Sequence, residues 1–286
     1  MYKYDFRNFG SYAAHTSRCA MNIYKHDLKI GLKPFIFWTA GLAFLLLAGM
    51  AKFLGVSGGS GAEMAAVLDK IPKIFLIVLG MGEVDILSLG GYYIVLESYI
   101  AVCIVIYGVF LGSNAVARES IDKTYEFIFT KPCTRFYILF NKISAAFTYL
   151  TVLCILNIIF SYAAFIILDI DNTIVKEMIL IGTANTLIGI LFFSLSVFLA
   201  AFASRSEKGT GYGYKIFMLT YIASIIYDVF DRAKILKIFL PLKYFKSTDL
   251  LEGNLDVFFV LISLVISFVF LALAFWAFEK RDLNTA

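Results

Sequence analysis

The sequence has few of the residues on which soluble proteins and most enzymes depend. Only 16% of its 286 residues are charged, and it contains 4 prolines, 4 cysteines and 2 histidines. The cysteines are far apart and form no CxxC pair, which argues against a disulfide framework and against a zinc site. No GxSxG or HExxH motif occurs, and both histidines lie near the N-terminus. We therefore expect no catalytic residue and no metal site.

Two stretches resemble nucleotide-binding motifs without meeting their requirements. Glu207–Lys215 (EKGTGYGYK) has glycines and a lysine but lacks the spacing and the hydroxyl residue of GxxxxGK[ST], and we interpret it as a flexible turn. Val56–Ser60 (VSGGS) is interpreted as a linker, because no pattern of a nucleotide-binding domain surrounds it. The net charge of +4 comes from basic residues scattered between apolar runs, which argues against nucleic acid as a partner.

Apolar residues are abundant: they make up 60% of the chain, 17% of the residues are aromatic, and the mean hydropathy is +0.83. A soluble domain of this size could not bury so much apolar surface, so the chain belongs to the membrane class. A membrane span needs about 20 mainly apolar residues in a helix. The predicted fold is an all-α membrane protein with six spans near Phe35–Leu54, Tyr92–Leu111, Phe136–Leu168, Met178–Ala203, Tyr214–Phe230 and Leu255–Phe278.

The third predicted span is too long for one crossing. Its first turns, with Asn141 and Lys142, are expected to extend into water. Ile71–Gly80 is apolar but too short to span, so we interpret it as an interfacial or re-entrant segment. Within the connection Asp228–Asn254, Ala233–Phe245 interleaves lysines with bulky apolar residues around Pro241, which is typical of short helices at a membrane surface.

The distribution of lysine and arginine predicts the orientation. With six spans, both termini lie on one side, and that side holds sixteen of the 25 basic residues. We therefore expect both termini in the cytoplasm, and no removable signal peptide before the first span. The chain divides into a cytoplasmic tail with a membrane-entry helix (1–34), a transmembrane domain (35–278) and a cytoplasmic tail (279–286).

The residues before the first span have an amphipathic pattern. In Arg18–Lys33, Lys25, Lys29 and Lys33 share one helical face, and only Asp27 does not fit the pattern. Such a helix would lie along the inner membrane face with its lysines toward anionic lipid headgroups. Pro34 is expected to turn the chain into the first span.

A second amphipathic helix is predicted between the second and third spans, from Arg118 to Thr130. Apolar residues recur at Ile121, Tyr125 and Ile128, and Pro132 disfavours a helical Lys131. Charged loops usually set only the topology of a membrane protein. An apolar face and a helix stop indicate in addition a surface for a cytoplasmic partner.

Gly112–Lys142 resembles the corresponding region of ABC-2 type exporter permeases. The family pattern has an acidic residue, a threonine, Glu-Phe or Glu-Leu, then Pro-x-Ser/Thr-Arg and a later lysine. Glu119, Thr124, Glu126, Pro132, Thr134, Arg135 and Lys142 match it position by position, whereas Lys123 stands where the family commonly has glycine. Tyr24–Trp38 is similar to the membrane-entry helix of the family.

The resemblance implies the transmembrane subunit of a bacterial ABC exporter in the plasma membrane. Its partners would be two copies of a cytoplasmic ABC ATPase, which would bind ATP and magnesium, and a second permease copy in a homodimer. This chain itself would hold no cofactor. The ATPase would contact the coupling helix through Arg118, Glu119, Asp122, Thr124, Tyr125, Glu126, Phe129, Pro132 and Arg135.

Three polar residues in predicted spans are candidates for a transport path: Glu97, Asn157 and Asn185. Glu97 is near the outer end of its span and could reach water there, whereas the asparagines suit hydrogen bonds between helices. With few charges at depth, we favour an amphipathic or apolar substrate such as a peptide over a hydrated ion. Drug, lipid or sodium efflux are the alternatives within the family. A secondary transporter or a membrane sensor subunit are alternatives outside it.

Overall fold

The computed structural model contains only helices among the elements that it describes. It covers the backbone of residues 9–57, 66, 68, 70–82, 84–121, 134–170, 172–203, 205, 207–230 and 234–280, and their side chains except for 9–21, 56–57, 119–120, 172, 207 and 234–235. Six of these helices are long and apolar enough to cross a membrane, which confirms the predicted all-α membrane fold. They are α1 (Phe9–Ser57), α4 (Leu89–Ile121), α6 (Arg135–Ile167), α7 (Val175–Phe202), α8 (Glu207–Phe230) and α10 (Val257–Lys280).

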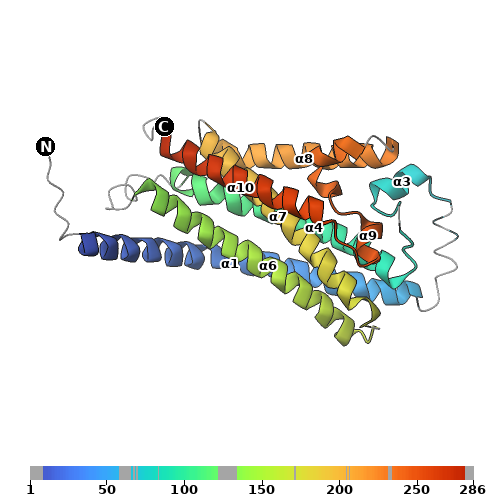
Figure 1. The fold of residues 1–286 in the computed structure, drawn as a ribbon. Coiled ribbons are helices and arrows are strands. Elements are labelled where there is room, and N and C mark those ends of the chain that lie inside the picture. The colour runs from blue at the N-terminus through green and yellow to red at the C-terminus, as the bar shows by residue number, and fades with distance from the viewer. Residues whose placement is uncertain are drawn as a thin grey trace.

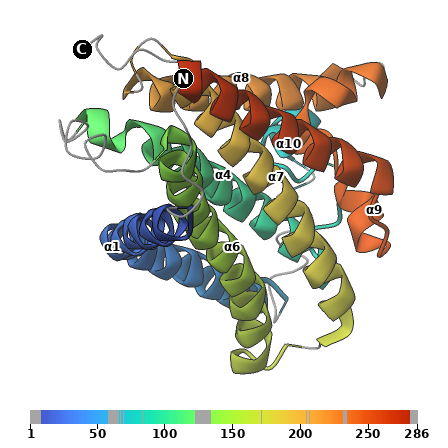
Figure 2. The same ribbon diagram turned by 60° about the vertical axis from the view of Figure 1, so that its left-hand side comes forward.

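Helices α4 and α7 form the centre of the bundle. In their most apolar windows 67% and 61% of the residues are buried, against 17% in α1 and in α8. Helices α1 and α6 pack along one side, and α8 and α10 along the other (Figures 1 and 2). The first residues of α1 and the last residues of α10 lie at the same end of the bundle, together with the end of α4 and the start of α6 (Figure 1). We call this the N-terminal end.

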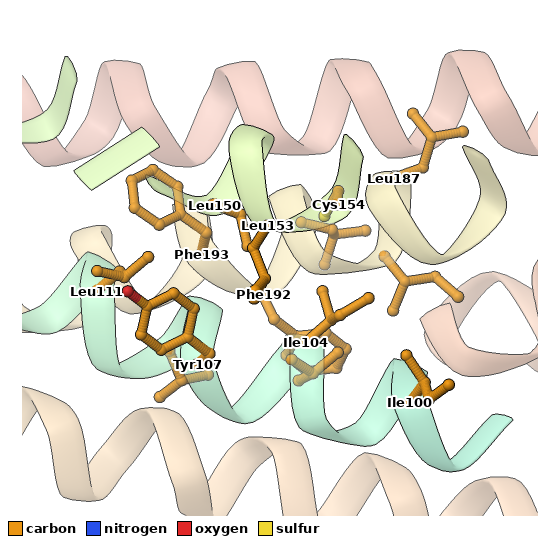
Figure 3. Close-up of a cluster of buried hydrophobic side chains, with 14 of the residues drawn as sticks. Ile100, Ile104, Tyr107, Leu111, Leu150, Leu153, Cys154, Leu187, Phe192 and Phe193 are labelled. Carbon is orange, nitrogen blue, oxygen red and sulfur yellow. The ribbon is translucent and has the colours of Figure 1, made fainter. Parts of the chain in front are cut away.

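The core between α4, α6 and α7 is built from aliphatic and aromatic side chains at close helix contacts. Ile104 and Tyr107 of α4 face Phe192 and Phe193 of α7, with Leu150 of α6 beside them (Figure 3). Glycines allow this close approach. A Cβ atom at Gly112 would lie 2.5 Å from the backbone oxygen of Phe193, so the two helices could not meet there with any larger residue.

Helix α1 corrects the expectation that Pro34 turns the chain. The helix is continuous for 49 residues, and Pro34 lies inside it. Proline removes one backbone hydrogen bond, but packing against α6 on both sides of it keeps the helix intact. Before Pro34, Tyr149 donates a hydrogen bond to the Leu28 carbonyl, and after it Phe35 packs on the Tyr149 ring at 4.8 Å.

Lys142 also differs from the expectation that the first turns of the third span extend into water. Its side chain is only 4% exposed and lies 3.9 Å from the carboxylate of Asp27 on α1. Tyr24 and Thr148 add a hydrogen bond of 3.0 Å between the same two helices. Asp27, which breaks the amphipathic pattern, thus faces a buried lysine on α6.

The proposed flexible turn at Glu207–Lys215 is wrong as well, because these residues form the first turns of α8. Two of their three glycines, Gly209 and Gly213, provide close helix packing. A Cβ atom at Gly209 would lie 2.4 Å from Cα of Ala200, and one at Gly213 would lie 2.8 Å from Val109. Helix α8 can therefore lie directly against α7 and α4.

Short helices close the end opposite the N-terminal end. The apolar segment after α1 forms α3 (Lys73–Val78), which is too short to span a membrane, as predicted. The segment before α10 forms η3 (Lys234–Phe239), η4 (Pro241–Lys243) and α9 (Ser247–Leu251), and η2 (Asn172–Ile174) precedes α7. The expected short helices in Asp228–Asn254 are thus confirmed, and they bury Leu240, Tyr244, Phe245 and Leu250.

Tyr244 anchors this segment to the bundle. Its hydroxyl donates to the carbonyl oxygen of Ile238 at 2.7 Å, and its ring stacks on Phe259 of α10 with centroids 5.0 Å apart. Burial raises the pKa of the Tyr244 hydroxyl. Lys237 lies over the other ring of this pair, 4.1 Å from the Phe259 centroid, so the segment packs onto α10 instead of lying free on a surface.

Candidate functional site

The three polar residues predicted inside spans come together in one buried cluster around the carboxyl group of Glu97. The Nδ2 of Asn157 lies 3.3 and 3.1 Å from its two oxygens, and the Nδ2 of Asn185 donates to Oε2 at 2.8 Å. The hydroxyl groups of Tyr93 and Ser161 lie 2.9 and 3.2 Å from Oε1. The cluster joins α4, α6 and α7, so the predicted hydrogen bonds between helices are confirmed for both asparagines.

Two members of the cluster, Tyr93 and Ser161, are absent from the sequence-based candidates. Tyr93 precedes Glu97 by one helical turn, and Ser161 follows Asn157 by one turn, so each shares a helical face with a candidate. This i, i+4 spacing of polar residues within apolar spans is the signal that could have identified them. Only the packing of α4 against α6 shows that the two pairs meet.

Glu97 is fully buried, in contrast to the expectation that it could reach water near the end of its span. The residue has no exposed surface, and Asn157 and Asn185 are 1% and 7% exposed. A buried carboxyl is expensive in a membrane unless it is hydrogen-bonded. The four surrounding donors provide these hydrogen bonds, which explains how the core accommodates Glu97.

A cavity of about 160 Å³ borders this cluster on the side of α8. It lies between α3, α4, α7, α8, η4 and α9. Its walls include the polar residues Glu97, Ser98, Asn185 and Ser224 and the apolar residues Ile94, Ala101, Ile188, Ile225 and Leu250. The cavity is thus an amphipathic space near the end opposite the N-terminal end.

Two tertiary interactions hold the walls of the cavity. Asp228 of α8 and Lys243 of η4, both lining residues, form an ion pair. The Tyr99 hydroxyl donates to the carbonyl oxygen of Leu79 at 2.7 Å and so ties α4 to the chain after α3. The short helices of this end are therefore fastened directly to the helices that form the cavity.

The predicted coupling helix is described only at its beginning. Arg118 belongs to the last described turn of α4, and the helix is continuous to Ile121, so no separate helix starts at Arg118. Asp122, Thr124, Tyr125, Glu126, Phe129 and Pro132 lie outside the described residues, as does the side chain of Glu119. Thr134 caps α6 by accepting a hydrogen bond from the backbone of Tyr137.

Arg135 has an intramolecular role at the N-terminal end. Its guanidinium group donates to the backbone oxygen of Glu279 at 3.4 Å, near the end of α10. A cation suits the negative end of a helix dipole. Arg118, in contrast, borders a small cavity of about 30 Å³ between α1, α4 and α6, together with Asp27, Tyr107 and Lys142.

The lysines predicted to face lipid headgroups, Lys25, Lys29 and Lys33, are all exposed on α1. On the opposite face Ile23 is buried against the bundle. The amphipathic character of this stretch is therefore present, within one long helix instead of a separate one. No group of three or more histidine, cysteine, aspartate or glutamate side chains comes together in the part of the chain that the structure describes.

Comparison with known proteins agrees with this architecture. The sequence model of the family described as ABC-2 family transporter protein matches residues 21–283, which include all six spans. No curated protein matches the chain. The permeases of this family associate with an ABC ATPase. The chain belongs to the ABC-2 family and is the transmembrane subunit of an ABC transporter.

Proposed function

We propose that this subunit exports an amphipathic substrate, with a peptide as the favoured cargo, and is driven by ATP hydrolysis in a separate ABC ATPase. The observation that supports the proposal is that α4 extends from the wall of the cavity to the predicted coupling segment. This helix has 33 residues, which corresponds to a length of about 50 Å. Its first half lines the cavity, and its last turn leads into the predicted coupling segment at the N-terminal end.

A helix of this kind can transmit a displacement. Helix α4 is packed against α7 along its length, and hydrogen bonds from Asn157 and Asn185 join it to α6 and α7 at the cavity. If an ATPase moves the coupling segment, the displacement is carried by a stiff element to the wall of the cavity. Tyr125 and Phe129 would anchor the ATPase, and Glu119 and Glu126 would orient it.

The cavity supports an amphipathic substrate. Most of its wall is aliphatic or aromatic, and its polar groups include Glu97 and Asn185 on one side and the Asp228–Lys243 ion pair on the side of α8 and η4. A hydrated ion would instead need a ring of polar ligands along its path. We place the protein in the bacterial plasma membrane with both termini in the cytoplasm, because sixteen of the 25 basic residues lie on that side. Two such chains would act with two ATPase subunits.

Reconstitution with the cognate ATPase in proteoliposomes tests the proposal. The Glu126→Lys variant should insert into the membrane normally but lose most ATP-dependent transport, because it reverses a charge at the predicted contact. Glu252→Lys is the matched control, since Glu252 is an exposed carboxylate after α9, at the other end of the bundle. Unchanged ATP-dependent transport by Glu126→Lys would contradict the proposed contact. Equal flux without ATP and without any partner would indicate a secondary transporter.

A further inference from the structure

Glu97 is a buried acidic group beside a cavity, and no described lysine or arginine pairs with it. The ion pairs among the described residues involve Asp27 and Asp228 as the acidic partners. The neighbours of Glu97 are amide and hydroxyl groups. Both carboxyl oxygens receive an N–H from an asparagine side chain, and such a group can only donate. These contacts therefore include no cationic side chain that would cancel a charge on Glu97.

The same cluster contains an unused acceptor. The Asn157 side-chain oxygen is buried and accepts no hydrogen bond from the described residues. Glu97 and Asn185 line the cavity, whereas Asn157 contacts the Glu97 carboxyl group but is not one of the lining residues. A ligand that suits a carboxyl group on a cavity wall carries N–H donors and a positive charge, which is the chemistry of an ammonium group.

We propose that the cavity binds the ammonium head of an amphipathic substrate, and that Glu97 determines the preference for a cationic over a neutral head. The apolar walls formed by Ile94, Ile188 and Ile225 would accept the hydrophobic part. This inference rests on the proposed function, because it specifies the substrate class of the same export path.

The second charged group at the cavity cannot replace Glu97 in this role. Asp228 is already neutralised by Lys243, and the two residues lie at the α8 and η4 side of the space. Glu97 has no exposed surface, so little water screens its charge. A cationic head would therefore interact much more strongly with Glu97 than with the Asp228–Lys243 pair.

A matched pair of probes tests the proposal. Dansylcadaverine has a primary ammonium group on a short chain with an apolar fluorophore, and its N-acetyl derivative keeps the chain and the fluorophore but ends in a neutral, slightly larger amide. Both are titrated by fluorescence anisotropy against the purified full chain in nanodiscs of zwitterionic lipid. The amine should bind about tenfold more tightly than the acetylated probe, as expected for one charge-assisted contact.

Four variants test whether Glu97 is the source of this preference. Glu97→Gln should bind both probes equally, with the acetylated probe bound as in the wild type, which shows that the cavity is intact. Ala101→Phe fills the cavity and should weaken both probes. Glu177→Gln, at the start of α7 and outside the cavity, should keep the tenfold preference. Glu97→Asp retains the carboxyl group, but its shorter side chain moves that group away from the cavity. An intermediate preference is therefore expected.

Equal binding of the two probes by the wild type would overturn the proposal, even if Glu97→Gln did not fold. A preserved preference in a folded Glu97→Gln variant would overturn it as well. The assay uses neither ATP nor the ATPase. Failure of ATP-driven export would therefore leave its result unchanged, and failure of amine recognition would leave the export experiment with Glu126→Lys unaffected.

Discussion

The hydrogen bond between α7 and Glu97 is expected to contribute measurably to the stability of the bundle. Replacement of Asn185 by alanine removes the donation of its Nδ2 to Oε2 of Glu97 at 2.8 Å and a contact of 3.3 Å to the Glu97 carbonyl. Hydrogen bonds to charged groups contribute about 1.5 to 3 kcal/mol in soluble proteins. Interhelical bonds in membranes average about 0.6 and reach about 1.7 kcal/mol.

For a short bond to a fully buried carboxyl we expect a value near the upper part of the membrane range. Asn185→Ala should therefore lower the free energy of unfolding by about 1 to 1.7 kcal/mol. The lost volume adds little to this cost, because Asn185 already borders the open cavity. Reversible unfolding in mixed micelles with increasing sodium dodecyl sulfate, followed by tryptophan fluorescence, measures the change.

Asn141, which forms no hydrogen bond to another helix among the described residues, is the matched control. Asn141 also lies on a spanning helix, but it donates only within its own helix, to the Tyr137 carbonyl. Asn141→Ala should change the free energy of unfolding by less than about 0.5 kcal/mol. The comparison separates the interhelical bond from the general effect of removing an amide.

A double-mutant cycle with Glu97→Met identifies the partner of Asn185. When the carboxyl is absent, Asn185→Ala should cost less, with a coupling energy of about 0.5 to 1.5 kcal/mol. If Asn185→Ala costs as much in the Glu97→Met background as in the wild type, the bond to Glu97 is not the source of its effect. A wild-type stability of Asn185→Ala would refute the reasoning directly.

Two further predictions concern helix packing and the closure of the cavity. Gly112→Ala should destabilise the protein by about 1 to 3 kcal/mol and lower its melting temperature, because the new Cβ would lie 2.5 Å from the Phe193 oxygen; Gly41→Ala, with nothing within 4 Å, should not. Equal melting temperatures of the two variants would contradict the close contact of α4 with α7. Tyr99→Phe should raise amide hydrogen exchange in residues 73–80 by about threefold to tenfold, because the bond to the Leu79 carbonyl is lost. The same change at the exposed Tyr162 should have no effect there, and unchanged exchange in Tyr99→Phe would show that this bond does not hold α3.

The number, type and order of the spans follow from composition alone. A bilayer requires long apolar helices, and nothing in the sequence competes with that requirement in the six segments. The short helices before α10 are also a local pattern, and they are present. The family pattern in Gly112–Lys142 identified the class of protein for the same reason, because it is a local sequence of residue types.

The incorrect predictions at Pro34 and at Glu207–Lys215 have a common cause. In both places, contacts between residues far apart in the sequence outweigh the local conformational preference. Pro34 is a helix breaker in isolation, yet α1 continues because α6 packs on both sides of it. The glycines of Glu207–Lys215 indicate flexibility in isolation, yet two of the three, Gly209 and Gly213, lie where α8 touches α7 and α4. In both cases tertiary packing outweighs a local preference of a few kcal/mol.

The polar residues in the spans show most clearly which features can be predicted from the sequence and which depend on packing. Hydropathy is a property of single positions, so it identified Glu97, Asn157 and Asn185 as unusual residues at membrane depth. Whether these residues meet depends on the rotation and relative height of α4, α6 and α7, which arise from side-chain packing between segments up to 88 residues apart. The spans can therefore be identified from the sequence alone, whereas the buried carboxyl cluster and its cavity exist only once the helices are packed.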